Sequence, residues 1–187
     1  RFPPSLLGWL LPALIAAVGG VLRFFRLGTP GTLIFDETYY VKEGWSLTQF
    51  GYEREWPEEP NPAFEAGDPW GVLETGDFIV HPPLGKWMIG AGIQLFGQDS
   101  SFGWRFAAAV VGTLSILIVG LIAWRMFRSA WLAAIASLLL AIDGEHLVHS
   151  RTSLLDIFLM FFVLLAFWLL IEDRVRRRGR IERALDA

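Results

Sequence analysis

Two adjacent carboxylates, Asp36 and Glu37, are the side chains of this 187-residue chain best suited to chemistry. They follow the apolar residues 33–35 and precede Thr-Tyr-Tyr at 38–40. An exposed acidic loop needs no such apolar lead-in, so we expect the pair beside a membrane or a partly dry surface, where a carboxylate can act as a general base. The structural alternative is that Asp36 caps a helix and Glu37 interacts with the helix dipole.

Four arginines could supply the positive charge that an anionic substrate needs. Each lies at or near one end of an apolar run, and taken singly each is explained by a side chain that reaches the membrane surface. Together, several guanidinium groups on one rim would form a bidentate clamp suited to phosphate. The four residues are Arg23, Arg26, Arg105 and Arg151.

Two further segments carry polar groups that an apolar environment does not explain. His81-Pro-Pro-Leu-Gly-Lys86 predicts a rigid turn entering a helix, but its glycine spacing is not that of a phosphate-binding P-loop. Its structural alternative is a plain helix start with a surface histidine. Asp156 lies about one turn inside an apolar run, so it should face protein or a wet cavity, with a structural bond and a site role both open.

The composition excludes several classes of protein. Hydrophobic residues make up 53% of the chain, the mean hydropathy is +0.44, and the absence of cysteine excludes disulfide frameworks and thiol catalysis. Residues 31–104 hold twelve acidic and three basic side chains, which disfavours nucleic-acid binding. The polar residues at 143–149 have no established metal-ligand spacing, so no metal site is predicted.

The apolar runs predict the elements that must position these residues. Runs at 5–22, 106–124, 130–142 and 154–171 are read as four membrane spans, the first as a retained helix in preference to a signal peptide. The arginines at 125–128 and 174–183 place both chain ends in the cytoplasm, and the basic tail is interpreted as a topology anchor.

We therefore expect an all-α polytopic membrane protein with interfacial helices in its first outer loop. Amphipathic stretches at Glu37–Phe50 and Leu84–Phe96 predict those helices, and residues 52–76 predict an irregular excursion. The expected parts are a first transmembrane helix with its outer end (1–27), an extracytoplasmic loop carrying the acidic pair (28–104), three transmembrane helices (105–171) and a cytoplasmic basic tail (172–187).

In combination and in order, these motifs resemble the protein O-mannosyltransferases, particularly the bacterial, actinobacterial-type branch. The resemblance runs from about residue 23 to residue 162. It implies a GT-C helix bundle at the cell membrane, multi-pass, with its catalytic loop on the extracytoplasmic side. It also implies transfer of mannose from polyprenyl-phosphate-mannose to Ser or Thr of exported proteins, with no cofactor or metal. Because family members are much longer, we expect this chain to be an N-terminal part.

The resemblance also implies roles for the residues above. The reaction would be a single inverting displacement with Asp36 as general base, while Glu37 positions the acceptor or supports Asp36. Arg105 with Arg23 would hold the leaving phosphate. Second choices for donor contacts, or for fixing the loop, are His81, Lys86 and Arg151, and Asp156 is a further candidate for substrate binding.

The expected partners are membrane lipid, the lipid-linked donor and the exported acceptor, and the export machinery is a candidate. Two alternative functions stay open. One is another GT-C transferase with a lipid or glycan acceptor, and the other is a non-catalytic membrane scaffold subunit.

Overall fold

A computed structural model describes residues 6–57, 60–68 and 71–186. Within these residues the fold is helical, and the only β pairing is an isolated bridge between Arg54 and Gly76. The helices are α1 (Leu6–Phe24), α2 (Glu37–Phe50), α3 (Asn61–Glu65), α4 (Leu84–Phe96), α5 (Ser101–Phe127), α6 (Ala130–Ile142), α7 (Gly144–His149) and α8 (Asp156–Leu185).

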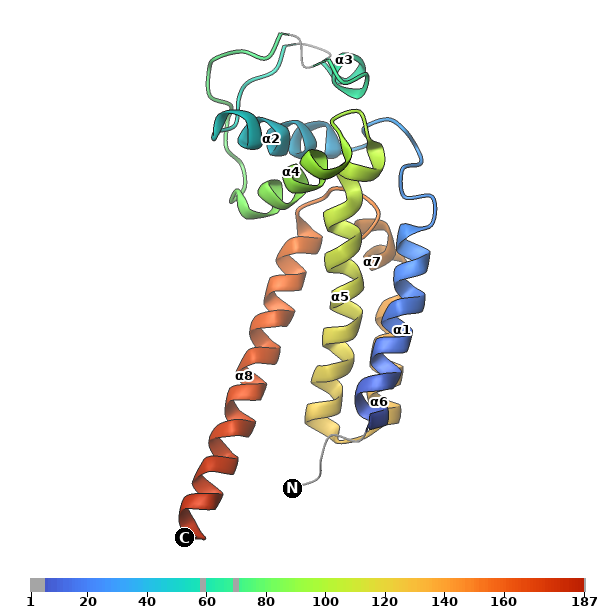
Figure 1. Cartoon of the computed structure of the whole chain (residues 1–187), viewed down its shortest axis with the longest axis vertical. Coiled ribbons are helices and arrows are strands. Elements are labelled where there is room, and N and C mark those ends of the chain that lie inside the picture. Colours follow the sequence, from blue (N-terminus) through green and yellow to red (C-terminus); the bar gives the residue numbers. More distant parts are fainter. Residues whose placement is uncertain (1–5, 58–59, 69–70, 187) are drawn as a thin grey trace.

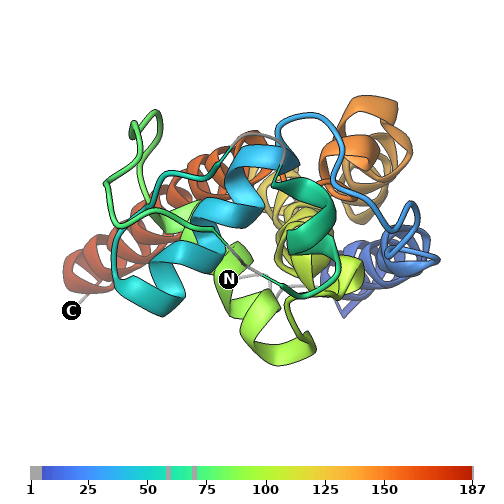
Figure 2. The ribbon, with the colours of Figure 1, turned by 90° about the horizontal axis from the view of Figure 1, so that it is seen from above.

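The helices form a bundle with a cap across one end. α1, α5, α6 and α8 run along the long axis, while α2, α3 and α4 lie across the top and the short α7 lies just below them (Figure 1). α1, α5 and α6 pack on one another, and α8 packs on α5. Seen from above, the cap lies over one side of the bundle, and α1 and α6 lie beside it (Figure 2). The cap therefore carries the acidic pair at one end of the bundle.

Two of the described helices, α1 and α5, are long and apolar enough to cross a membrane. α6 is apolar but has 13 residues, so its length of about 20 Å falls short of a hydrocarbon core of about 30 Å. The apolar part of α8 begins with an acid at Asp156. The structure thus supports two spans, and the four-span topology stays a prediction.

Two predicted boundaries differ from the structure. α5 begins at Ser101 rather than at the expected boundary of 105, because the Ser100 side chain caps the helix by accepting a hydrogen bond from the Gly103 amide. α8 continues without a break through the expected boundary at 171–172. Its arginine-rich end favours helix, and Asp173 pairs with Arg177 one turn later.

The helices predicted over 37–50 and 84–96 are confirmed with the expected bounds, as α2 and α4, while their place at the membrane interface stays a prediction. Their backbones touch, because a Cβ atom added at Gly90 would lie 2.5 Å from the carbonyl oxygen of Gly44. α4 meets α5 equally closely, where a Cβ at Gly92 would lie 2.3 Å from the carbonyl oxygen of Gly103. Small residues therefore let the cap sit directly on the bundle.

For the described residues of 52–76 the irregular prediction also holds, apart from the short α3 and the bridge between Arg54 and Gly76, while residues 58, 59, 69 and 70 lie outside the described part. Phe64 of α3 is fully buried, with its ring 5.4 Å from Trp56 and 6.2 Å from both Trp45 and Trp104. Such aromatic contacts fix the excursion to the cap and to α5.

Candidate active site

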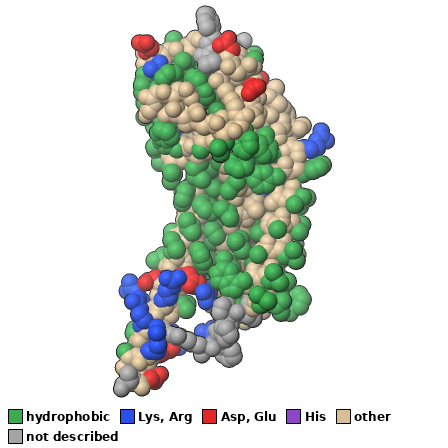
Figure 3. Space-filling view, in the orientation of Figure 1, with side chains coloured by type: hydrophobic (Ala, Val, Ile, Leu, Met, Phe, Trp, Pro, Cys, Tyr) green, Lys and Arg blue, Asp and Glu red, His purple; other side chains and the backbone are tan. Residues whose placement is uncertain are grey.

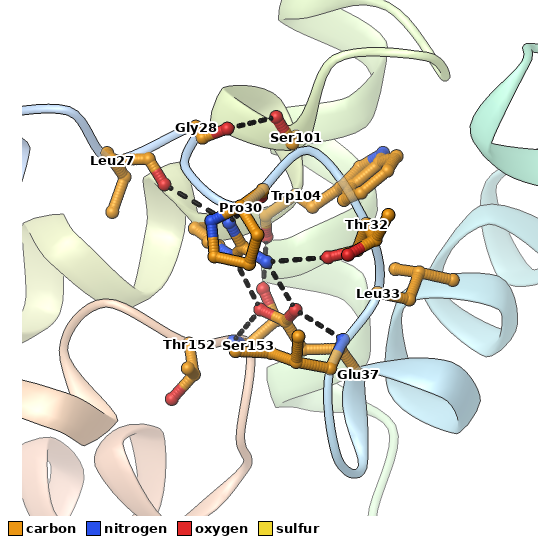
Figure 4. A network of polar contacts seen from close by, with 12 residues as sticks. Leu27, Gly28, Pro30, Thr32, Leu33, Glu37, Ser101, Trp104, Thr152 and Ser153 are labelled. Atoms are coloured by element: carbon orange, nitrogen blue, oxygen red, sulfur yellow. Dashed lines mark hydrogen bonds and ion pairs between the residues drawn. The ribbon is translucent and has the colours of Figure 1, made fainter.

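Glu37, the second acid of the predicted pair, points inward and is completely buried. Its carboxylate forms a bidentate ion pair with Arg105 of α5, in which Nε and Nη2 each donate at 2.7 Å (Figure 4). It also accepts hydrogen bonds from the backbone amides of Ser153 at 2.9 Å and Ile34 at 3.2 Å. Glu37 therefore ties α2 to α5 and to the segment that leads into α8.

Arg105 uses the rest of its guanidinium to hold the loop between α1 and α2. Besides its two bonds to Glu37, it donates to the carbonyl oxygens of Leu27 at 3.3 Å, Pro30 at 2.7 Å and Thr32 at 3.0 Å. A guanidinium has five N–H donors, and these five bonds account for all of them. Arg105 was expected to bind the phosphate of the substrate. In the structure it is buried, and all its donors bind protein.

Asp36 is half-buried and stands apart from that network. It occupies the N-cap position of α2, as the helix-cap alternative predicted, but its side chain makes no capping hydrogen bond. Among the described residues its carboxylate has no hydrogen-bond or ion-pair partner. The two neighbouring acids therefore differ: the Glu37 carboxylate is bonded within the fold, whereas the Asp36 carboxylate is free to bind a ligand or accept a proton.

The backbone immediately before Asp36 is strained. Phe35 has φ 52°, a left-handed conformation that costs a non-glycine residue about 1–2 kcal/mol. Contacts on either side hold it there, because the Glu37 amide donates to the carbonyl oxygen of Ile34 and the Glu37 carboxylate accepts from the Ile34 amide. Strain held by surrounding contacts is common at reactive positions.

Tyr40 links Asp36 to two other predicted residues, although the sequence analysis did not single it out. Burial raises the pKa of Tyr40, and the nearby carboxylates of Asp36, Glu43 and Asp156 raise it further. The exposed ring of His81 lies 5.6 Å from the Tyr40 ring, edge to face. The missed signal is the spacing, since position 40 is one helical turn after Asp36.

Lys86 of the HPPLGK segment is buried in the cap. Its ammonium group lies 2.8 Å from Glu53 and 3.0 Å from Glu43, which joins α4 to α2 and to the irregular excursion. Burial raises the pKa of Glu43, and Lys86 opposes that shift. These contacts fit the predicted role of fixing the loop, and they leave Lys86 enclosed by protein.

Arg23 and Arg151 connect the end of α1 to the α7–α8 region. Buried Arg23 donates to the Ser150 hydroxyl at 3.1 Å and lies 2.7 Å from Nδ1 of His146. Because a guanidinium only donates, Nδ1 accepts and the imidazole carries its proton on Nε2. Arg151 donates to the carbonyl oxygens of three residues near the end of α1, namely Leu22, Arg23 and Phe25, at 2.8–2.9 Å.

The predicted site residues therefore fall into two sets. Asp36, His81 and the exposed Asp156 lie near Tyr40, while the other set is bonded into the fold and comprises Glu37, Lys86, Arg23, Arg105 and Arg151. Arg26 belongs to neither set, because it is exposed and no described residue pairs with its guanidinium. Within the described part of the chain, no group of three or more His, Asp or Glu side chains could hold a metal ion. The arrangement offers one uncommitted half-buried carboxylate on a rigid support, which suits proton transfer.

Comparison with known proteins indicates the same family as the sequence motifs. Residues 80–180 match the family model described as dolichyl-phosphate-mannose-protein mannosyltransferase. The polyprenol-phosphate-mannose–protein mannosyltransferase of Mycobacterium tuberculosis is 40% identical over 182 residues, and that of Mycolicibacterium smegmatis is 39% identical over 180 residues. The protein of the same name from Corynebacterium glutamicum is 36% identical over 172 residues.

These alignments cover 90–95% of this chain but 31% of each relative, so the chain spans about a third of their length. No solved structure matches the chain. The helical architecture and the two candidate spans agree with a membrane protein of the GT-C type. On the family model and on the extent of these matches, the chain belongs to the dolichyl-phosphate-mannose-protein mannosyltransferase family.

Proposed function

We propose that the protein containing this chain transfers mannose from polyprenyl-phosphate-mannose to Ser or Thr hydroxyls of exported proteins. The names of the bacterial relatives support this donor and a protein acceptor. The uncommitted carboxylate of Asp36, beside a neighbour that is wholly bound within the fold, is the observation that carries the chemical part of the proposal.

In the proposed step the acceptor hydroxyl oxygen attacks the anomeric carbon of mannose. The new C–O bond forms as the bond from that carbon to the phosphate oxygen breaks, and the configuration at the carbon inverts. Asp36 takes the hydroxyl proton, and the phosphate leaves with the bonding electron pair as the polyprenyl phosphate. Because phosphate is already a good leaving group, the step needs no strong acid.

Glu37 and Arg105 act in this proposal as positioning residues. Their ion pair fixes the first turn of α2, and the carbonyl contacts of Arg105 fix the loop that delivers Asp36 to it. Arg23 has the same kind of role at the end of α1. Rigid support of this kind keeps the base within the small distance range that proton transfer requires.

In this proposal His81 binds the phosphate of the mannose donor. His81 is exposed beside Tyr40, whereas Arg23 and Arg105, first expected to hold the leaving phosphate, are buried and bonded to protein. An imidazole N–H can donate to a phosphate oxygen. Asp156 lies near the same tyrosine and would orient the sugar or the acceptor.

We place this site on the extracytoplasmic side of the cell membrane. Arginines gather at the opposite end of the bundle, beyond a band of hydrophobic side chains (Figure 3). The positive-inside rule assigns such an end to the cytoplasm. Four spans, with α6 and α8 added to the two candidate helices, would put the cap outside.

The test is an assay of the full-length protein in membranes, with labelled polyprenyl-phosphate-mannose and three acceptors. We expect label on a Ser/Thr peptide, none on a matched Ala/Val peptide, and none on added lipid or glycan. The anomeric configuration of the peptide product, read by NMR, should be opposite to that of the donor. Transfer to lipid or glycan alone would refute the protein acceptor, and retention of configuration would refute the single displacement.

A further inference from the structure

Tyr40 of α2 holds a hydroxyl group that the fold leaves free. Its half-buried ring packs against the hydrophobic cluster shared by α2, α4, α5 and α8, and it meets the ring of His81 edge to face at 5.6 Å. In the described part of the chain the hydroxyl makes no hydrogen bond, and it is not one of the buried polar atoms that lack a partner. The hydroxyl therefore reaches the surface and can bind a ligand, while the ring stays fixed.

Three carboxylates lie near Tyr40, and two of them are free. Glu43 is paired with Lys86 at 3.0 Å. The carboxylates of Asp36 and Asp156 have no hydrogen-bond or ion-pair partner among the described residues. Burial and the three negative charges raise the pKa of Tyr40, so its phenol keeps its proton at neutral pH and can donate as well as accept. The free groups are thus two acceptors and one group that does both.

This set of groups suits a sugar. Each hydroxyl of a sugar can donate and accept, so it matches carboxylates that accept and a phenol that does both. The free carboxylates of Asp36 and Asp156 repel negative charge, which disfavours a phosphate at the same point. In the proposed function the phosphate is bound by His81, whose ring contacts that of Tyr40, so the sugar joined to the phosphate would lie beside the Tyr40 hydroxyl.

We propose that Tyr40 is a specificity-determining residue, whose hydroxyl forms a hydrogen bond with one ring hydroxyl of the donor mannose. This role rests on the proposed function and adds to it a contact that recognises the sugar. Asp36 then remains available to the acceptor, and Asp156 is left to bind a second hydroxyl of the same sugar. A donor sugar in which the first hydroxyl is absent or inverted would lose the bond, which selects for mannose.

The experiment measures donor binding to the full-length protein by isothermal titration calorimetry. The probes are polyprenyl-phosphate-mannose, polyprenyl phosphate without a sugar, and a set of donor analogues that each lack one hydroxyl of the mannose. Tyr40→Phe removes the hydroxyl and keeps the ring against His81 and the hydrophobic cluster. Tyr39→Phe is the matched control, because the adjacent Tyr39 is exposed and its side chain has no bonded partner among the described residues.

We expect Tyr40→Phe to bind polyprenyl-phosphate-mannose about five-fold more weakly than wild type, because it loses one hydrogen bond. Its affinity for polyprenyl phosphate, and both affinities of Tyr39→Phe, should change by less than about two-fold. One deoxy analogue should bind wild type about five-fold more weakly than the complete donor does, and Tyr40→Phe should bind the two equally well.

Equal losses of affinity with and without the sugar would overturn the role of the Tyr40 hydroxyl, as would equal losses in the two tyrosine variants. It would also be overturned if Tyr40→Phe discriminated against every deoxy analogue as strongly as wild type does. A wild-type protein that does not bind polyprenyl-phosphate-mannose at all would refute the proposed function itself.

Discussion

Replacing Glu37 by glutamine tests whether the buried ion pair holds the active-site loop. The carboxylate accepts four hydrogen bonds, two from Arg105 and one each from the amides of Ser153 and Ile34. A glutamine NH₂ on either side would face two of those donors, so at least two bonds are lost. The guanidinium would also remain buried without its counter-charge.

Removing one partner of a buried ion pair costs about 3–5 kcal/mol. Because Arg105 also binds the carbonyls of the loop, this cost should appear as easier local opening of residues 27–36. Hydrogen exchange of peptides from this loop in the full-length protein measures it directly. At about 1.4 kcal/mol per factor of ten, Glu37→Gln should speed exchange by about two to four orders of magnitude.

Asp36→Asn is the matched control, because the Asp36 side chain makes no bond that the substitution would break. Its effect on loop exchange should correspond to less than about 0.5 kcal/mol. The double variant Glu37→Gln/Arg105→Gln should lose less than the sum of its single variants, since contacting residues couple. If Glu37→Gln exchanges as slowly as wild type, or if Asp36→Asn speeds exchange of the loop as much as Glu37→Gln does, then Glu37 is not the acid that holds the loop.

Three further predictions concern the cap and use thermal unfolding of the full-length protein. Lys86→Met removes the charge that opposes the raised pKa of Glu43, so the folded variant should bind a proton more readily than wild type as pH falls. The stability difference between the variant and wild type should therefore shrink from pH 8 to pH 5. A difference that does not change with pH would contradict this. Gly90→Ala should lower the free energy of unfolding by about 1–3 kcal/mol, because its Cβ atom would collide with the α2 backbone. Gly144→Ala is the control, since a Cβ atom there would meet open space. Equal losses of stability in the two variants would refute the close packing of α2 on α4. Burial lowers the pKa of Lys42 to about 8 in the folded protein, whereas lysine in the unfolded chain keeps its proton up to about pH 10.5. Because the unfolded state then binds more protons, the stability of the fold should rise with pH between about 8 and 10.5. Lys42→Met should abolish that rise.

Local signals in the sequence were sufficient to place α2 and α4 of the cap, but not the short α3. The Pro-Pro pair at 82–83 precedes α4, and glycines at 51 and 97 follow α2 and α4 directly. Such start and stop residues act within one turn of the helix, so their effect is visible without knowledge of the fold. The same local logic misplaced the start of α5, where the capping serine lies outside the apolar run.

The partners of the charged residues could not be predicted in this way. Both members of the Glu37–Arg105 pair were singled out from the sequence, yet they are 68 positions apart and were assigned to substrate rather than to each other. Lys86 likewise meets Glu53 from across the cap. Whether a charge binds substrate or protein depends on burial and on what the packed fold brings opposite it, which residue type and spacing do not specify.

The central claim is that Asp36 accepts the acceptor proton while Glu37 serves the fold. Its most direct test is single-turnover mannose transfer by full-length Asp36→Asn, with donor binding measured in parallel. We predict a rate about 10²–10⁴-fold below wild type with unchanged donor affinity, because a positioned general base contributes about that much. Transfer within a few-fold of the wild-type rate would contradict the assignment of Asp36 as the base.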